Sequence, residues 1–513
     1  MGYWFYGALC LVYLGAAFLL FRKHVHIFQL NSYKHNVQEK WARDNIEPLM
    51  LRTVWALAAV FLLRELGSVW GSISAAVLFA VVGLLNRPQQ AKKPLVFTAR
   101  VKRLLATYGV LHLIPILFGF FAPDGEAFGA LLMSFALVGA PWLILAADSL
   151  NKPIEKAISN GYVKDAKRIL SECPDLKIIG VTGSYGKTSV KFFLEKLLSV
   201  QYNTLVTPLN YNTTLGVVRT VRENLRATHE VFVCEMGARN VGDIKEICDL
   251  VHPQMGVITA IGPQHLESFK SIQNVVKTKF ELADSLPAEG VFFGNLDDDN
   301  IRGRKVNVKT VGYGTLRGDY RAENITCDEH GLRFTVRGVE FETKLLGKHN
   351  VQNLCAAIAV ANTLGIPLER LRQPVRQLEA VEHRQQLRGS GNRLIIDDAY
   401  NSNPAGALAA LETLSLFEGL RILVTPGMVE LGAKQTELNT QFGRDAASRC
   451  DWAVLVGKKQ AAPIQAGLIE AGFPKERILV KDTVQEAIAA ADAIDANGGR
   501  RVILLENDLP DNY

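Results

Sequence analysis

A segment whose residue types bind phosphate lies at Thr182-Gly-Ser-Tyr-Gly-Lys-Thr-Ser189. A short apolar run at 177–181 predicts a buried strand before it, and an amphipathic pattern at 190–200 predicts a helix after it. In this strand–turn–helix context, glycines turn backbone N–H groups toward phosphate oxygens, a lysine reaches the β- and γ-phosphates, and a threonine can ligate Mg²⁺. The usual first glycine of the pattern is Val181 here. We therefore expect a nucleotide-phosphate loop whose contacts come from Gly183, Ser184, Gly186, Lys187, Thr188 and Ser189.

Polar residues also follow each of the next predicted strands. Glu235 ends the apolar run 231–235, His265 follows the run 255–261, and Asn295 and Asp298 follow the run 290–293. The carboxyl ends of parallel strands meet at one sheet edge, where ligands bind. Glu235 could hold Mg²⁺ or be a solvated strand end, and a single histidine is more often structural than catalytic. The pattern favours a ligand site at this edge.

The elements that carry these residues alternate between strand and helix from residue 177 onward, which predicts an α/β fold. At 513 residues the chain is long enough for two to four domains. Its 48% hydrophobic and 21% charged residues exclude a disordered protein. Seven cysteines without metal-binding spacing argue against a disulfide framework.

The first 150 residues have the composition of a membrane domain. The stretch 3–21 has no charged residue and is long enough to cross about 30 Å of hydrocarbon. It lacks a basic start and a small-residue cleavage site, which predicts an anchor rather than a signal peptide. We expect about five transmembrane helices, at 3–21, 46–63, 66–85, 104–121 and 128–147.

The basic residues of this region predict its orientation. The connections 22–45 and 87–103 hold five and six Lys or Arg residues, whereas 123–126 holds none. Five spans place both basic connections and the rest of the chain in the cytoplasm, with the N-terminus outside. Four spans, with 54–85 as one tilted helix, and a buried soluble helical domain are the alternatives. Because the net charge of +6 belongs to residues 1–150, nothing indicates a nucleic-acid partner.

The order and content of the motifs resemble those of the Mur ligases, a family of ATP-dependent amide ligases of bacterial cell-wall synthesis. Within that family the chain most resembles the type that adds D-alanyl-D-alanine to UDP-N-acetylmuramoyl-tripeptide. The resemblance is carried by the phosphate loop and by Glu235-Met-Gly237, Gly262-Pro-Gln-His-Leu-Glu267, Asn295-Leu-Asp-Asp298, Gly347-Lys-His-Asn-Val-Gln-Asn353, His383-Arg384, Asp397-Asp-Ala-Tyr-Asn-Ser-Asn-Pro404 and Met428-Val-Glu-Leu-Gly432.

The apolar stretches predict an α-helical membrane domain, and the resemblance implies that two α/β domains follow it. Residues 1–150 would be the membrane domain, and 151–382 a doubly wound, P-loop central ATP-binding domain. Residues 383–513 would be a Rossmann-like C-terminal domain. It also implies ATP and Mg²⁺ as cofactors and an acyl phosphate intermediate that an amine attacks.

Residue roles implied by the resemblance fall into four groups. Lys279 matches a lysine that is carbamylated in many relatives, although it could be an exposed helix lysine. The stretch 401–404 could be an ordinary turn. The implied catalytic residues are Lys187, Glu235, His265, Lys279 and Arg384, and the implied Mg²⁺ ligands are Thr188, Glu235, His265 and Lys279. Further residues implied to bind the nucleotide are Asn295, His349, Asn350, Asn353, Arg384 and Asp398. The residues implied to bind the substrates are Asn210, Asn212, Thr213, Thr214, Tyr400, Asn401 and Asn403.

Three departures from the family pattern bear on the substrate. Residues 212–216 read Asn-Thr-Thr-Leu-Gly, where the dipeptide-adding type has Asn-Asn-Glu-Ile-Gly. Residues 502–511 are acidic, where the family has a Lys-Gly-Ser-Arg run. Only about 30 residues separate the last predicted span from the phosphate loop, so no room remains for the family's UDP-sugar domain.

These departures leave several interpretations open. The leading one is a multi-pass membrane ligase with cytoplasmic catalytic domains, joining a UDP-linked or lipid-linked cell-wall precursor to an amino acid or dipeptide, with membrane lipid as a further partner. The alternatives are a membrane-bound synthetase of a poly-γ-glutamate-like polymer and a non-enzymatic membrane scaffold. The scaffold is disfavoured because the chain retains the whole set of Lys187, Thr188, Glu235, His265, Lys279, Arg384 and Asp398.

Overall fold

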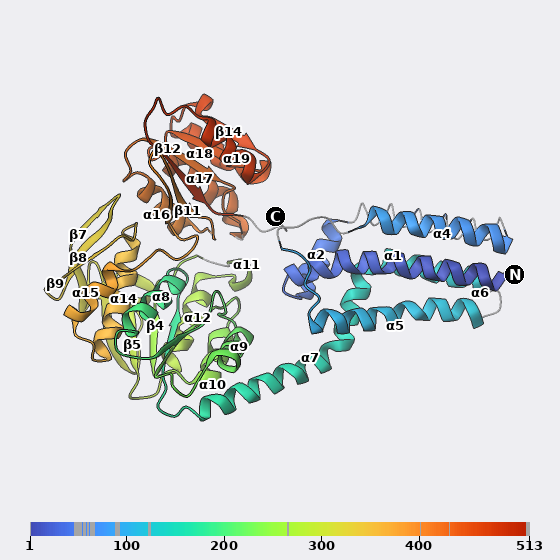
Figure 1. Ribbon diagram of the computed structural model, residues 1–513, viewed down its shortest axis with the longest axis horizontal. Helices are drawn as coiled ribbons and strands as arrows, with labels where there is room; N and C mark the ends of the chain where they lie inside the picture. Colours follow the sequence, from blue (N-terminus) through green and yellow to red (C-terminus); the bar gives the residue numbers. More distant parts are fainter. Residues whose placement is uncertain are drawn as a thin grey trace. The chain divides into compact units, whose positions relative to one another are not determined.

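The structure is a computed structural model that describes residues 2–45, 67–87, 93–121, 125–263, 266–400, 402–429 and 431–508, together with 54, 58 and 61. Its residues form two compact units, divided between Asn160 and Gly161. The first unit is helical, and the second is an α/β unit with two sheets (Figure 1).

The helical unit is built around its first helix, whose side chains Tyr6, Tyr13 and Phe21 are fully buried. Close approach to a neighbouring helix depends on Gly83, where a Cβ would lie 2.9 Å from the backbone of Ala16. The helices are α1 (Gly2–Leu30), α2 (His35–Asp44), α4 (Gly67–Leu85), α5 (Ala99–Phe121), α6 (Gly125–Val138) and α7 (Ala140–Ser171).

Among the described residues, the segments Trp4–Leu30 and Ala99–Phe121 are long and apolar enough to cross a membrane. The helices α6 and α7 would add a third span if they formed one despite a bend of 84°. Gly139 lies at the break, and Pro141 has no N–H group to continue the hydrogen-bond ladder of α6, so both residues favour a bend here. The predicted span at 46–63 lies largely outside the described residues, and five spans therefore stay a prediction.

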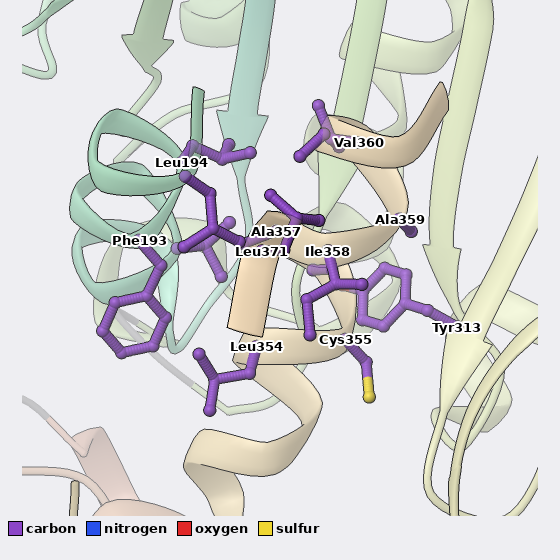
Figure 2. Packing of buried hydrophobic residues seen from close by; sticks show 14 of the residues in the cluster. Phe193, Leu194, Tyr313, Leu354, Cys355, Ala357, Ile358, Ala359, Val360 and Leu371 are labelled. Atoms are coloured by element: carbon purple, nitrogen blue, oxygen red, sulfur yellow. The ribbon is translucent and has the colours of Figure 1, made fainter. Parts of the chain in front are cut away.

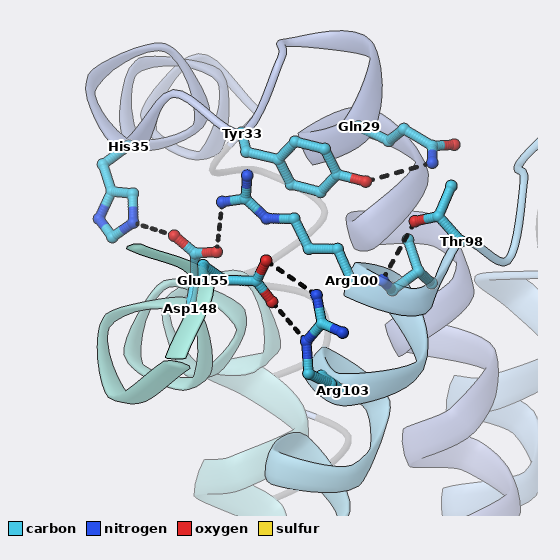
Figure 3. Close-up of polar contacts among 9 residues, drawn as sticks. Gln29, Tyr33, His35, Thr98, Arg100, Arg103, Asp148 and Glu155 are labelled. Atoms are coloured by element: carbon cyan, nitrogen blue, oxygen red, sulfur yellow. Dashed lines mark hydrogen bonds and ion pairs between the residues drawn. The ribbon is translucent and has the colours of Figure 1, made fainter. Parts of the chain in front are cut away.

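One end of the helical unit carries a layer of charged contacts (Figure 3). The buried carboxylate of Asp148 accepts hydrogen bonds from His35 Nε2 and Arg100 Nη2, each at 2.8 Å. Arg103 donates to both oxygens of Glu155, at 2.6 and 2.9 Å. These pairs tie α2 and α5 to α7, and their residues lie in or beside the basic connections that predict the cytoplasmic side.

The larger unit begins with a mixed sheet whose strand order is β2-β3-β1-β4-β5-β6-β7-β8-β9. Pairing is parallel from β2 through β7 and antiparallel in the last three strands. The strands are β1 (Lys177–Thr182), β2 (Thr204–Val206), β3 (Val231–Glu235), β4 (Met255–Ile258), β5 (Val291–Asn295), β6 (Lys309–Gly314), β7 (Tyr320–Asp328), β8 (Gly331–Val336) and β9 (Val339–Thr343).

Helices cover both faces of this sheet, as the alternation of strand and helix patterns predicts. One face packs against α8 (Lys187–Leu198), α14 (His349–Thr363) and α15 (Leu368–Arg376). The other packs against the end of α7 and against α9 (Thr214–Asn224), α10 (Asp243–Val251) and α12 (Ile272–Asp284). The short helices α11 (Leu266–Phe269) and α13 (Asp299–Arg302) complete this part.

The core under α14 depends on small side chains (Figure 2). Ala356, Ala357 and Ala361 are fully buried in this core. Their size allows α14 to lie close to α8, where Phe193 and Leu354 fill the space between the helices. This packing places the first turns of α8 and α14 beside each other.

The C-terminal part has a second mixed sheet, in the order β10-β11-β15-β12-β13-β14, with only the β10–β11 pair antiparallel. Helices α16 to α18 pack on one face and α19 on the other. The elements are β10 (Gln386–Ser390), β11 (Arg393–Asp398), α16 (Pro404–Leu414), β12 (Leu420–Thr425), η1 (Gly432–Lys434), α17 (Gln435–Ala447), β13 (Trp452–Val456), α18 (Lys458–Glu470), η2 (Lys475–Arg477), β14 (Ile478–Lys481), α19 (Val484–Ala493) and β15 (Arg501–Glu506).

Replacing the fully buried Leu354 by alanine should lower the free energy of unfolding of the α/β unit by about 2–5 kcal/mol, because it leaves a cavity between α8 and α14. Urea unfolding followed by circular dichroism measures this change. Leu316→Ala is the control, since Leu316 is 72% exposed and its loss should cost less than about 0.5 kcal/mol. Equal effects of the two changes would contradict this account of the core.

Candidate active site

Two glycines shape the loop between β1 and α8. Gly183 has φ +149° and Gly186 has φ +79°, conformations that favour glycine. A Cβ at Gly183 would collide with the Thr259 hydroxyl, and one at Gly186 would collide with Asn353 Oδ1 on α14. The loop therefore requires glycine both for its backbone angles and for its close contacts.

The segment after β4 holds this loop from one side. The backbone N–H of Ser184 donates to the Ala260 carbonyl at 2.6 Å. The Ser184 hydroxyl donates to the Gly262 carbonyl at 3.0 Å and accepts from the Gly262 N–H at 3.1 Å. Ser184 is therefore committed to anchoring the loop, and the backbone amides after it are the groups left to bind an anion.

Lys187, at the start of α8, donates to the carbonyls of Gly183 and Ser184 at 2.6 and 3.1 Å. Burial lowers the pKa of its ammonium to about 8, with a further lowering from Arg384 and an opposing effect of Glu235. Its only hydrogen-bond partners in the described structure are neutral carbonyls. A phosphate oxygen would be a stronger, charged acceptor for the same ammonium.

The buried carboxylate of Glu235, at the end of β3, is the point where the surrounding side chains meet. Its Oε1 accepts from the Thr188 hydroxyl at 3.2 Å and from Asn212 Nδ2 at 3.0 Å. Its Oε2 lies 3.2 Å from Lys191 Nζ, yet has no hydrogen-bond partner in the described structure. A buried oxygen without a hydrogen bond, beside a hydroxyl, fits the hard oxygen ligands that Mg²⁺ prefers.

Lys279, on α12, is 3% exposed, and no hydrogen bond or ion pair of its side chain is found in the described structure. Burial holds the pKa of the Lys279 ammonium well below its usual range, and the nearby charge of Lys187 lowers this pKa further. The carboxylates of Glu281, Asp243 and Glu235 oppose the shift. Burial excludes the interpretation of an exposed helix lysine. A neutral amine is the form that can react with CO₂.

The first turn of α14 brings three more predicted nucleotide residues to the loop. Asn353 contacts Gly186 as described and donates to Asn350 Oδ1 at 3.3 Å. Asn350 in turn donates to the Leu346 carbonyl at 2.7 Å. The His349 Nδ1 atom is buried without a hydrogen bond, and burial, with Arg384, lowers the pKa of its ring to about 4.

The C-terminal part contributes Arg384 and Asp398 to the surroundings of the loop. Arg384 is near enough to lower the pKa values of Lys187 and His349, and its guanidinium lies 4.5 Å from the centre of the Tyr400 ring. Burial raises the pKa of Asp398 to about 6, while Arg384 opposes this shift. Arg384 is thus the cation that the second sheet brings toward the phosphate loop.

Two family models match this part of the chain. The Mur ligase middle domain matches residues 181–361, and the Mur ligase glutamate ligase domain matches residues 383–505. The UDP-N-acetylmuramoyl-tripeptide–D-alanyl-D-alanine ligase of Escherichia coli is 30% identical over 351 residues, which cover 64% of this chain and 77% of that protein. The chain belongs to the Mur ligase family. It is therefore an ATP-dependent ligase.

Two further relatives agree with this assignment. The ligase of the same name from Bacillus subtilis is 34% identical over 320 residues, covering 61% of this chain and 69% of that protein. The crystal structure of MurF from Acinetobacter baumannii superposes with a TM-score of 0.63 at 28% identity, covering 68% of this chain and 77% of that one. Both Mur ligase models begin at or after residue 181, so residues 1–180 lie outside them.

The remaining predicted site residues make other contacts or lie outside the described residues. Asn295 is buried and donates to the Thr259 carbonyl at 3.0 Å, beneath the loop. Thr213 and Asn403 accept from backbone N–H groups as N-caps of α9 and α16. Ser189 and Thr214 lie in the first turns of α8 and α9, Asn210 is exposed, and His265 and Asn401 are outside the described residues.

The sequence interpretation did not include Lys191 or Glu506. Lys191 follows Lys187 by four residues, a spacing that places both on one side of a helix, and this was the available signal. Glu506 ends β15 with 2% exposure, where its carboxylate accepts from the hydroxyls of Ser402 and Thr425, the latter at 2.6 Å. It lies in the acidic run that departs from the family pattern.

Burial raises the pKa of Glu506 from 4.5 to about 7, with a smaller contribution from Asp398. Because the folded state holds this proton more tightly than the unfolded state, the stabilisation is complete below pH 4.5 and is lost as the pH rises through 7. Between pH 5 and 8, wild type should lose up to about 3 kcal/mol relative to Glu506→Gln. Urea midpoints at each pH measure this difference, and parallel pH profiles of the two proteins would contradict it.

Proposed function

We propose that this chain is a membrane-associated ligase that joins D-alanyl-D-alanine to the carboxylate of a muramoyl-tripeptide cell-wall precursor. The observation that carries the proposal is the set of contacts around Glu235, with Thr188 and Asn212 on one oxygen and Lys187 on the adjoining loop. Such a set can hold the phosphates and Mg²⁺ on one side and a substrate carboxylate on the other. The names of the relatives from Escherichia coli and Bacillus subtilis support the choice of the two substrates.

The chemistry requires two displacements. A carboxylate oxygen of the precursor attacks the γ-phosphorus of ATP, forming an acyl phosphate and releasing ADP. The amine of the acceptor then attacks the acyl carbon, which releases inorganic phosphate, and the amine loses a proton as the amide forms. Both steps depend on positioning and charge compensation, which is what these side chains supply.

In this proposal, Lys187 and the loop amides hold the β- and γ-phosphates, and Arg384 adds positive charge from the C-terminal part. Thr188 and Glu235, with His265 and a carbamylated Lys279, would hold Mg²⁺, which supplies charge to the phosphate oxygens when bound. Asn212, already in contact with Glu235, would orient the carboxylate. This proposal also assigns substrate binding to the remaining predicted residues, which are Asn210, Thr213, Thr214, Tyr400, Asn401 and Asn403.

We further assign residues 1–150 to a membrane domain, 151–382 to the ATP-binding domain and 383–513 to the C-terminal domain, with both catalytic domains in the cytoplasm. The two long apolar helices and the basic connections support the membrane assignment. Because residues 1–180 lie outside the Mur ligase models, the membrane domain stands where the soluble enzymes carry a UDP-sugar domain. The precursor is therefore either UDP-linked or presented on a lipid.

The detergent-purified chain should release phosphate from ATP and Mg²⁺ only when both D-alanyl-D-alanine and a muramoyl-tripeptide precursor are present. The UDP-linked and lipid-linked forms are supplied in separate reactions, and turnover of either supports the ligase. Lys187→Ala should lower the rate at least about 100-fold, because the phosphates lose their cation. Lys196→Ala, on the exposed side of the same helix, should retain it. No phosphate release with either precursor would contradict the proposal.

Lys279→Met should lower turnover at least about 100-fold, because methionine cannot form a carbamate that carries negative charge to the metal site. The amine nitrogen forms a bond to the carbon of CO₂ and releases one proton. Carbon-13 bicarbonate should give a carbamate NMR signal in wild type that is absent from Lys279→Met. Lys277→Met is the matched control, because Lys277 is exposed two residues away. Full activity of Lys279→Met would contradict this role.

A further inference from the structure

Lys191 is a lysine without any solvent exposure, one helical turn after Lys187 on α8. An ammonium in such a place is costly unless charged or polar partners surround it. Two partners do so: Glu235 Oε2 at 3.2 Å and the backbone carbonyl of Leu209 at 2.7 Å. The first belongs to the end of β3, and the second to the segment between β2 and α9.

That segment, residues 207–213, carries the predicted substrate residues Asn210 and Asn212. Its Leu209 has φ +46°, a left-handed conformation that is unfavourable for leucine, and the side chain is 71% exposed. Apolar burial therefore does not hold Leu209 in place. The hydrogen bond from Lys191 to its carbonyl is a contact that offsets this backbone cost.

Three further hydrogen bonds attach the segment to the end of β3. Thr207 Oγ1 accepts from the Glu235 N–H at 3.1 Å, Asn212 Nδ2 donates to Glu235 Oε1 at 3.0 Å, and the Asn212 carbonyl accepts from the Gly237 N–H at 2.7 Å. Lys191 approaches from α8, the helix that begins at the phosphate loop. It is thus the side chain that joins the phosphate-loop helix to both Glu235 and the segment.

We propose that Lys191 is a positioning residue, which fastens the substrate segment 207–213 and the Glu235 carboxylate to the helix of the phosphate loop. This inference rests on the proposed function for the identity of the segment as a substrate loop. Lys191 acts through its two partners, Glu235 and the Leu209 carbonyl. Its role is to keep Asn212 aligned with the phosphate to be transferred.

Lys191→Met tests this role, because methionine has a similar volume but neither the charge nor the donor. Hydrogen exchange of the backbone amides of 207–213 should become about tenfold to 100-fold faster, the range expected on loss of a hydrogen bond to a charged group. The affinity for ADP without Mg²⁺ should change less than about threefold, since Lys187 and the loop are retained. With substrates, kcat/KM for the precursor should fall at least tenfold while the KM for ATP stays near the wild-type value.

Lys196→Met is the matched control, because Lys196 is exposed on the same helix and should leave exchange and kinetics unchanged. Since Lys191→Met leaves Glu235 buried without its cation, the double variant Lys191→Met/Glu235→Gln removes that charge. In the double variant the thermal midpoint should recover while exchange of 207–213 stays fast, because the Leu209 carbonyl still lacks its donor.

If the backbone amides of 207–213 exchanged at the wild-type rate in both Lys191 variants, the inference would be overturned. Faster exchange spread evenly over the whole α/β unit in the double variant would also overturn it, by indicating loss of general stability. Exchange and ADP binding do not require turnover. A wild-type chain that fails to ligate would therefore contradict the proposed function, while the exchange data would still decide the role of Lys191.

Discussion

The buried carboxylate of Glu235 is the constraint on which the rest of the centre depends. A negative charge removed from water is tolerated only where donors and cations compensate it. Thr188 and Lys191 do so from α8, and Asn212 does so from the segment 207–213, so that this helix, this segment and the end of β3 are held in one arrangement. The same carboxylate would stabilise a divalent cation, so the contacts that order the centre also suit it to Mg²⁺ and the phosphates.

The fold brings these groups together by placing them at the carboxyl edge of the first sheet. Strand β1 lies between β3 and β4, and therefore the phosphate loop has Glu235 on one side and the segment after β4 on the other. Close packing of α8 against the alanine-rich α14 adds Asn353 from a helix more than 150 residues further along the chain. The second sheet supplies Arg384, which completes the positive surroundings of the loop.

Electrostatics distinguish the two kinds of basic group in the centre. Lys187 and Lys279 both have lowered pKa values because they are buried, yet Lys187 has carbonyl partners, whereas Lys279 has none in the described structure. The surroundings of Lys187 suit an ammonium that can bind phosphate, whereas those of Lys279 suit a neutral amine. In the C-terminal part, burial instead raises the pKa values of Asp398 and Glu506. Asp398 lies in the motif 397–404, and Glu506 lies in the acidic run 502–511.

The sequence alone determined the features that depend on contiguous residues. Three features are of this kind: the strand–loop–helix segment with Gly183 and Gly186, the alternation that predicts an α/β fold, and the motif order that indicates the Mur ligase family. Only the tertiary structure decided which of the polar residues meet. Lys191, Leu209 and Glu235 are separated by 18 or more residues, and no local pattern records a contact across that distance. Likewise, burial distinguishes Lys279 from its exposed neighbour Lys277, because solvent access depends on packing from the whole unit and not on residue type.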